Sequence, residues 1–193
     1  GQYGIGQSVR REEDPRLLRG HGAYVGDVTL PRQSYAYFLR SPHPHAKITS
    51  LDITAAKCAP GVLEIFIGSD VVEDNLGTPG MVAKRKRPDG EDMWAPPQTA
   101  LALGRVRYVG DPIALVVAET VDQAKSAVEM IKIEFNPLPS VTDTAKTIDP
   151  GAPAVWDECP DNISHIHETG DKNGTDEAFK NATTVVKRRF VIT

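Results

Sequence analysis

The clearest pattern of apolar and polar positions lies in the second half of the chain. Pro112 to Ala118 is a continuous apolar run, which is typical of a strand covered on both faces. Thr120 and Gln123 have the form of a capping box, and the apolar residues that follow share one helical face. Lys132 to Phe135 then alternates as a strand. These residues predict a β-α-β unit whose tight connections keep its strands near one another.

Three further stretches predict strands upstream of that unit. Gln33 to Arg40 is rich in aromatic residues and ends at Ser41-Pro42, because proline cannot continue a hydrogen-bonded ladder. Ala46 to Ile53 and Val62 to Ile67 have strand-like apolar residues. Strands mixed with helices predict an α/β fold with a mixed sheet.

Helices are expected at three other places. Thr54 to Cys58 predicts one turn, stopped by Pro60-Gly61. Asp70 to Glu73 has the form of a capping box, so a brief helix is expected after it. Asp176 to Asn181 predicts a short helix in the tail.

The composition divides the chain into three regions. Residues 1–31 form a polar, glycine-rich and extended lead-in, in which Gly20, Gly22 and Gly26 predict sharp turns. Residues 32–141 form a compact domain, with an alternative start near residue 19. Residues 142–193 are a linker and a strand. Within the domain, Asn75 to Gln98 is rich in Gly and Pro and predicts a long exposed excursion.

The tail ends in a strand pattern from Thr183 to Ile192 with no turn or cap behind it. An unpaired apolar strand is an aggregation liability. We therefore expect its partner strands to lie in polypeptide beyond this sequence, which makes the chain a fragment.

The totals narrow the class of protein. The chain has 193 residues, of which 40% are apolar and 25% are charged, the balance of a globular protein. The net charge of −4 argues against a general polyanion binder. No apolar stretch is long enough to cross a bilayer, and the polar start is unlike a secretory signal.

The two cysteines form no CxxC motif, which fits a reducing, cytoplasmic location. Cys58 stands in alanine-rich surroundings and is expected in the core. Neither it nor Cys159 has neighbours that would activate a nucleophile.

Two histidine pairs, His43-Pro44-His45 and His165-Ile166-His167, are the metal candidates. A metal site needs three or four supported ligands, and no Cys or carboxylate cluster stands at ligand spacing to either pair. Pro44 makes the first pair a turn, so surface histidines are the favoured interpretation.

Two other motifs suggest ligand binding. Gly4-Ile5-Gly6 resembles the start of a dinucleotide-binding loop, but no strand precedes it and Val9 stands at the third glycine position. Lys84 to Arg87 could bind phosphate, but Asp89, Glu91 and Asp92 partly cancel its charge. A solvated loop is favoured for the basic run. We therefore assign no catalytic, cofactor-binding or metal residue.

Several long motifs occur in the same order as in a known family. They are Gly6 to Asp27, Leu30-Pro31, Phe38 to Ala46, Ala59 to Val62, Val106 to Thr120, and Ala124 to Pro139. They resemble the opening domain of molybdenum hydroxylase large subunits, the α/β-hammerhead of the xanthine dehydrogenase, aldehyde oxidase and aerobic carbon monoxide dehydrogenase kind. Within this family, the chain resembles the bacterial carbon monoxide dehydrogenase large subunit and its relatives more than the eukaryotic enzymes.

The resemblance implies an enzyme when the subunit is complete. It implies a molybdenum–molybdopterin cofactor, as a cytosine dinucleotide, held with the catalytic glutamate in later domains. It also implies electron transfer to iron–sulfur and FAD partner subunits. This part alone is expected to be inactive, to pack against the cofactor-bearing domains and to help wall the substrate passage.

Two other hypotheses remain open. The chain could be a stand-alone subunit that assembles such a complex, in which case a second polypeptide would carry the molybdenum domain. More remotely, it could bind nucleic acid through Lys84 to Arg87, with an affinity that falls steeply with salt.

Overall fold

A computed structural model describes residues 4–6, 8–9, 11–79, 84–87 and 89–190. The chain divides into two compact units. Unit 1 comprises residues 1–39, 52–65 and 115–132, and unit 2 comprises residues 40–51, 66–114 and 133–193. Three predicted segments are described only in part. Residues 7 and 10 of the motif from Gly6 to Asp27, residues 80–83 and 88 of the Asn75 to Gln98 excursion, and residues 191 and 192 of the expected tail strand lie outside the described residues.

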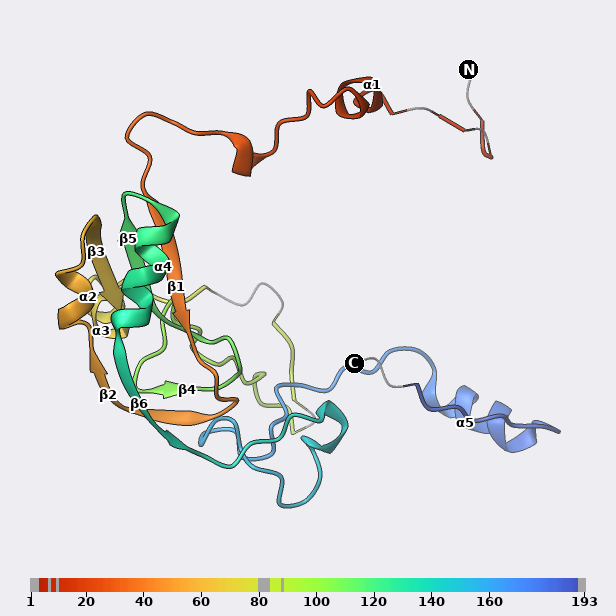
Figure 1. Cartoon of the computed structure of the whole chain (residues 1–193). Helices are drawn as coiled ribbons and strands as arrows, with labels where there is room; N and C mark the ends of the chain where they lie inside the picture. Colours follow the sequence, from red (N-terminus) through yellow and green to blue (C-terminus); the bar gives the residue numbers. More distant parts are fainter. Residues whose placement is uncertain (1–3, 7, 10, 80–83, 88, 191–193) are drawn as a thin grey trace. The chain divides into compact units, whose positions relative to one another are not determined.

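The first sheet has three strands in the order β1 (Tyr35–Arg40), β5 (Pro112–Ala118), β3 (Val62–Ile67) (Figure 1). The central strand β5 is the predicted apolar run, with the predicted bounds. Ile113 and Ala114 are adjacent in sequence and both are fully buried, so the strand is covered on both faces. Pro112 takes the first position, where a missing N–H does not interrupt the ladder.

The second sheet has the order β4 (Arg105–Val106), β2 (Ala46–Asp52), β6 (Lys132–Pro137). β2 and β4 are antiparallel, with Ala46 opposite Val106 and Lys47 opposite Arg105. Ala46 and Val106 are fully buried, so this pair anchors the sheet to the core. β4 is a short strand that the sequence analysis did not predict.

The predicted β-α-β succession is present as β5, α4 (Val121–Met130) and β6, but its strands are in different sheets. They are therefore not a parallel pair of neighbours. A tight connection predicts proximity along the chain, whereas pairing depends on which strands offer free backbone edges. The mixed α/β class itself is confirmed.

The predicted cap of α4 is confirmed, because the Thr120 hydroxyl accepts a hydrogen bond of 3.2 Å from the Gln123 N–H. Ala124 and Ala127 are fully buried on one face of α4. The helix contacts α2 (Thr54–Lys57), whose buried residue is Ala56. These small side chains permit close packing within unit 1.

Two details of the predicted turns are wrong. α3 (Gly68–Glu73) begins earlier than expected, and Asp70 is the third helical residue rather than the cap, since its carboxylate accepts from the Ile67 N–H at 2.7 Å. Cys58 is exposed rather than part of the core. It follows the last residue of α2, and the buried position of that turn is taken by Ala56.

The lead-in contains two short helices that were not predicted, α1 (Asp14–Leu18) and η1 (Val25–Asp27). Pro15 lies at the start of α1, where its missing N–H costs nothing. Of the three glycines expected to turn the chain, Gly20 has a positive φ of 74°, and Gly22 and Gly26 do not.

The tail contains η2 (Thr144–Lys146) and α5 (Lys172–Asn181), which is longer than expected because Asp171 caps it through the Gly174 N–H. The strand expected from Thr183 is wrong for the described residues, since residues 183–190 are irregular and exposed. A strand needs a neighbour for its backbone groups, and apolar composition alone does not supply one.

Among the described residues, no helix is both long and apolar enough to pass through a bilayer.

Thr120→Ala is expected to lower the free energy of unfolding by about 1 kcal/mol, because the first turn of α4 loses the hydroxyl acceptor of its cap. Urea denaturation followed by circular dichroism measures the change. Ser126→Ala is the matched control on the exposed side of the same helix and should leave stability almost unchanged. Equal effects of the two substitutions would show that the cap contributes nothing.

Gly68→Ala is expected to destabilise by about 1–3 kcal/mol, the usual cost of overpacking. A Cβ atom on Gly68 would overlap the backbone carbonyl of Ala102, which cannot rotate away as a side chain can. Gly26→Ala is the control, since a Cβ there meets nothing within 4 Å. The same denaturation measurement should rank the two, and a Gly68→Ala protein as stable as the control contradicts this packing.

Candidate functional site

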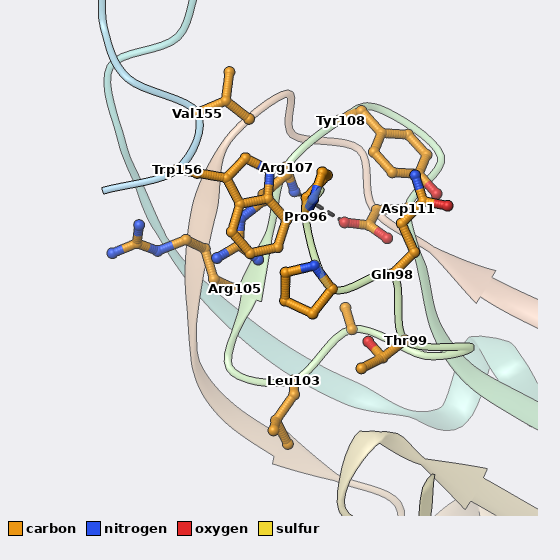
Figure 2. Close-up of a pocket in the computed structure, with 12 residues that line it drawn as sticks. Pro96, Gln98, Thr99, Leu103, Arg105, Arg107, Tyr108, Asp111, Val155 and Trp156 are labelled. Atoms are coloured by element: carbon orange, nitrogen blue, oxygen red, sulfur yellow. Dashed lines mark hydrogen bonds between the residues drawn. The ribbon is translucent and has the colours of Figure 1, made fainter. Parts of the chain in front are cut away.

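Unit 2 contains a cavity of about 520 Å³ (Figure 2). Its walls come from the segment before β4, from β4 and the turn that follows it, and from a loop of the tail. Figure 2 shows Arg105, Arg107 and Trp156 on one side of the view and Gln98, Tyr108 and Asp111 on the other. The lining residues are Pro96, Pro97, Gln98, Thr99, Ala102, Leu103, Arg105, Arg107, Tyr108, Asp111, Val155 and Trp156.

Arg105 is the first residue of β4, and Arg107 directly follows the strand. Arg105 and Arg107 flank Val106 in sequence, and successive side chains of extended backbone point to opposite faces. Val106 is fully buried opposite Ala46, so its two neighbours are directed to the other face, where the cavity lies. The core contact of one valine therefore fixes the direction of two guanidinium groups.

Arg107 stacks on the indole of Trp156, with its Cζ atom 3.4 Å from the ring centroid. That separation is a van der Waals stacking distance and gives a cation–π contact. The Nε atom of Arg107 is buried and has no hydrogen-bond partner among the described residues. Burial lowers the pKa of Arg107 from its ordinary value, and the nearby positive charge of Arg105 lowers it further.

Asp111 lies in the turn that leads into β5. Its Oδ2 atom accepts a hydrogen bond of 2.9 Å from the backbone N–H of Arg107, and its own N–H donates to the Tyr108 carbonyl at 3.1 Å. Gly110 has a φ of 91° in this turn, which favours glycine. Burial raises the pKa of Asp111, and burial also raises the pKa of Tyr108.

The remaining polar contacts hold the Trp156 loop in place. Arg105 donates a hydrogen bond of 3.1 Å to the Asp157 carboxylate. This bond is the largest of the effects that keep the pKa of Asp157 below its ordinary value. Trp94 packs edge-on against Trp156 with ring centroids 6.3 Å apart. The loop that provides the indole is thus tied to β4 by an ion pair and supported by a second aromatic ring.

The histidine pairs are not brought together as a metal site in the described part of the chain, where no group of three or more His, Cys, Asp or Glu side chains could hold a metal ion. The surface interpretation is wrong for His45, which is buried and whose Nδ1 atom lies 2.9 Å from the Pro139 carbonyl oxygen. Its ring is a packing element of unit 2. His43 packs edge-on against Phe135 at 4.8 Å.

The second pair has local partners as well. His167 is exposed, and its Nδ1 atom lies 2.9 Å from Nη1 of Arg85. His165 is half-buried. The glycine motif at residues 4–6, which resembled a dinucleotide-binding loop, is exposed and lies in a turn rather than between a strand and a helix.

The basic run is not simply a solvated loop. The side chain of Arg87 is only 19% exposed, and it bonds to the Asp161 carboxylate at 2.5 Å and to the Ile163 carbonyl. Lys86 pairs with Asp92 at 2.7 Å. The expected charge compensation by the following acidic residues is therefore present. Much of the run is used for binding the tail rather than for presenting a basic surface.

The Asn75 to Gln98 excursion is accordingly less exposed than expected where it is described. The backbone N–H of Trp94 donates to the backbone carbonyl of Ser164 at 3.0 Å, and the Ser164 hydroxyl donates to the backbone carbonyl of Trp94 at 2.7 Å. The thiol of Cys159 is buried beside Arg87, and burial raises its pKa. Contacts between segments far apart in sequence are not visible in local composition.

Sequence reasoning missed the main residues of the cavity, namely Arg105, Arg107, Asp111 and Trp156. One available signal was the pair of arginines flanking a valine, which alternates as a strand does. The contribution of Trp156 comes from a distant loop, and no spacing rule connects it with β4.

The chain belongs to the family described as the aldehyde oxidase and xanthine dehydrogenase a/b hammerhead domain, whose model matches residues 19–139. The resemblance inferred from the motifs is thus confirmed. The chain is 39% identical to the nicotine 6-hydroxylase large subunit of Paenarthrobacter nicotinovorans, over 96% of this chain and 22% of that protein. It is 33% identical to the carbon monoxide dehydrogenase large chain of Afipia carboxidovorans, over 97% and 23%.

A solved structure supports the same assignment. The Cu,Mo-CO dehydrogenase in its carbon monoxide reduced state matches with a TM-score of 0.72 and 31% identity, over 94% of this chain and 23% of that one. The hammerhead fold is therefore shown by both sequence and structure. The chain spans less than a quarter of the length of these relatives.

Arg87→Gln is expected to destabilise the protein at neutral pH, because it breaks the contacts that hold residues 159–163. The pKa of Asp161 lies below the ordinary aspartate value of 3.8. The hydrogen bond from the backbone N–H of Ile163 lowers it most, and the hydrogen bond and charge of Arg87 lower it as well. A carboxyl with a lowered folded-state pKa stabilises above its unfolded-state pKa, and this contribution is lost as the pH falls through the folded-state value. The difference between Arg87→Gln and the unsubstituted chain should therefore shrink below pH 3.8.

Urea denaturation at a series of pH values measures this difference. Lys172→Gln breaks an exposed pair with Asp176 and serves as the control, with a smaller effect at neutral pH. A pH-independent difference for Arg87→Gln would show that Asp161 is not the partner that matters.

Proposed function

We propose that this chain is the N-terminal, non-catalytic domain of a molybdopterin-dependent hydroxylase large subunit of the carbon monoxide dehydrogenase-like type. The observation that carries the proposal is the agreement of the family match over residues 19–139 with the structural match over 94% of the chain. The complete subunit would oxidise or hydroxylate a small substrate with oxygen derived from water. No catalytic step is assigned to this chain.

In the complete subunit, the chain would pack against the cofactor-bearing region and help to wall the substrate passage. The tail supports the packing role, since Val185, Val186 and Phe190 are 44%, 69% and 86% exposed. Exposed apolar side chains that stand close together are typical of surfaces that another part of a protein covers.

The cofactor of the proposed subunit is molybdenum–molybdopterin, as the cytosine dinucleotide, with iron–sulfur and FAD groups in partner subunits. The described residues of this chain do not fit a metal centre, and the cavity of unit 2 offers guanidinium, carboxyl and indole groups instead. In this proposal another region of the complete subunit holds the molybdenum group. The use of two unpaired cysteines supports a cytoplasmic location.

The test compares two polypeptides, this chain alone and the same chain joined to the next several hundred residues of its reading frame. Molybdenum is measured by mass spectrometry, and release of cytidine monophosphate by acid reports the dinucleotide form. We expect both with the longer polypeptide and neither with the 193-residue chain. Stoichiometric molybdopterin or turnover of an aldehyde, a purine or carbon monoxide by the short chain would overturn the proposal.

The same purification distinguishes the proposal from the alternative that this chain is a stand-alone assembly subunit. If the short chain copurifies with a second polypeptide that carries the molybdenum, the domain is an assembly subunit rather than part of one chain. Nucleic-acid binding through Lys84 to Arg87 receives no support from the geometry, because Lys86 and Arg87 are paired with carboxylates.

A further inference from the structure

We propose that the cavity of unit 2 is a binding site for a small organic monocarboxylate, which the guanidinium of Arg107 holds while stacked on Trp156. This inference goes beyond the proposed function and does not depend on it. It rests on the missing counter-charge of Arg107 and its stacking on Trp156, on the size and walls of the cavity, and on the charges around it.

The guanidinium of Arg107 lacks the partner that an enclosed cation requires. Among the described residues, no carboxylate lies within ion-pair distance of it and its Nε–H has no acceptor. Arg105 and Arg87, which are similarly enclosed, are both paired with aspartates. A partly buried cation without a counter-charge is costly, and an anion in the cavity would offset its charge.

Stacking on Trp156 prepares the group for a planar anion. A Cζ-to-centroid distance of 3.4 Å sets the guanidinium against the indole face, so that its N–H groups point outward along its edges. Those edges match the two oxygens of a carboxylate, which arginine binds in a bidentate manner. Because the ring already restrains the side chain, little further entropy is lost when the ligand binds.

The walls and size of the cavity suit the organic part of such a ligand. Pro96, Pro97, Leu103 and Val155 provide apolar surface next to the charged group. The volume of about 520 Å³ falls within the range of about 300–1,000 Å³ that is usual for small-molecule sites. A carboxylate with an apolar ring would therefore bury its hydrocarbon surface and expose its anion to Arg107.

The charge of the surroundings favours one negative charge over two. Asp111 lines the same cavity, and its carboxyl is held by the backbone N–H of Arg107. An ionised Asp111 repels a dianion more strongly than a monoanion. Inorganic phosphate should for this reason bind less well than a monocarboxylate, although both could reach the guanidinium.

The chain contains two tryptophans, so its indole N–H signals provide a direct readout. We would titrate the ¹⁵N-labelled protein with sodium benzoate, and in parallel with acetate, phosphate and chloride at matched ionic strength. Trp94→Phe assigns the two signals. We expect a saturable shift of the Trp156 signal with benzoate, with weaker binding of acetate and no saturable binding of phosphate or chloride.

Arg107→Gln should abolish the response, and Arg107→Lys should weaken it at least tenfold, because an ammonium lacks the planar fork. Lys172→Gln, which lies outside the cavity, should bind as the unsubstituted chain does. If Arg107→Gln does not give a folded amide spectrum, Leu103→Phe narrows the cavity without touching the charge and should weaken binding as well.

Three outcomes would overturn the proposal. They are the absence of a saturable shift with any carboxylate, an undiminished response in Arg107→Gln or Leu103→Phe, and phosphate binding as tight as benzoate binding. None of them bears on the molybdenum measurement, so this inference and the proposed function fail separately.

Discussion

Burial of the apolar strand β5 is the constraint on which the rest of the structure depends. Its first residues are enclosed on both faces, and this fixes the turn that precedes them. The Ala102 N–H donates to the Pro112 carbonyl at 2.7 Å, while Ser41 exchanges backbone hydrogen bonds with Gly110 and Asp111. Arg40 also donates to the Gly110 carbonyl at 2.9 Å. The carboxyl of Asp111 is thereby held against the backbone of Arg107, so the position of the cavity follows from the packing of a strand.

The features that could be predicted from the sequence are those that depend on neighbours along the chain. The apolar run of β5, the cap at Thr120 and the proline that ends β1 each act within a few residues, and all are present. The partition of strands between two sheets could not be predicted. It depends on which backbone edges meet in space, and β5 and β6 are separated although one short helix joins them.

The errors at single residues have a similar origin. His45 and Arg87 were interpreted as solvent-exposed because polar residues usually are. Each is instead enclosed by a distant segment that supplies an acceptor, the Pro139 carbonyl for the histidine and the Asp161 carboxylate for the arginine. Cys58 illustrates the opposite case, since an alanine-rich context did not bury it. Local composition reports average burial, whereas these positions depend on individual long-range partners.

The wall that Trp156 provides has a consequence for how this domain is delimited. The residues shared with the hammerhead family end at residue 139, and the indole lies beyond that limit. A protein trimmed to the family boundary would retain Arg105 and Arg107 but lose the indole on which Arg107 stacks. The limit of the family match and the limit of the cavity therefore differ, since the cavity includes Val155 and Trp156 from beyond residue 139.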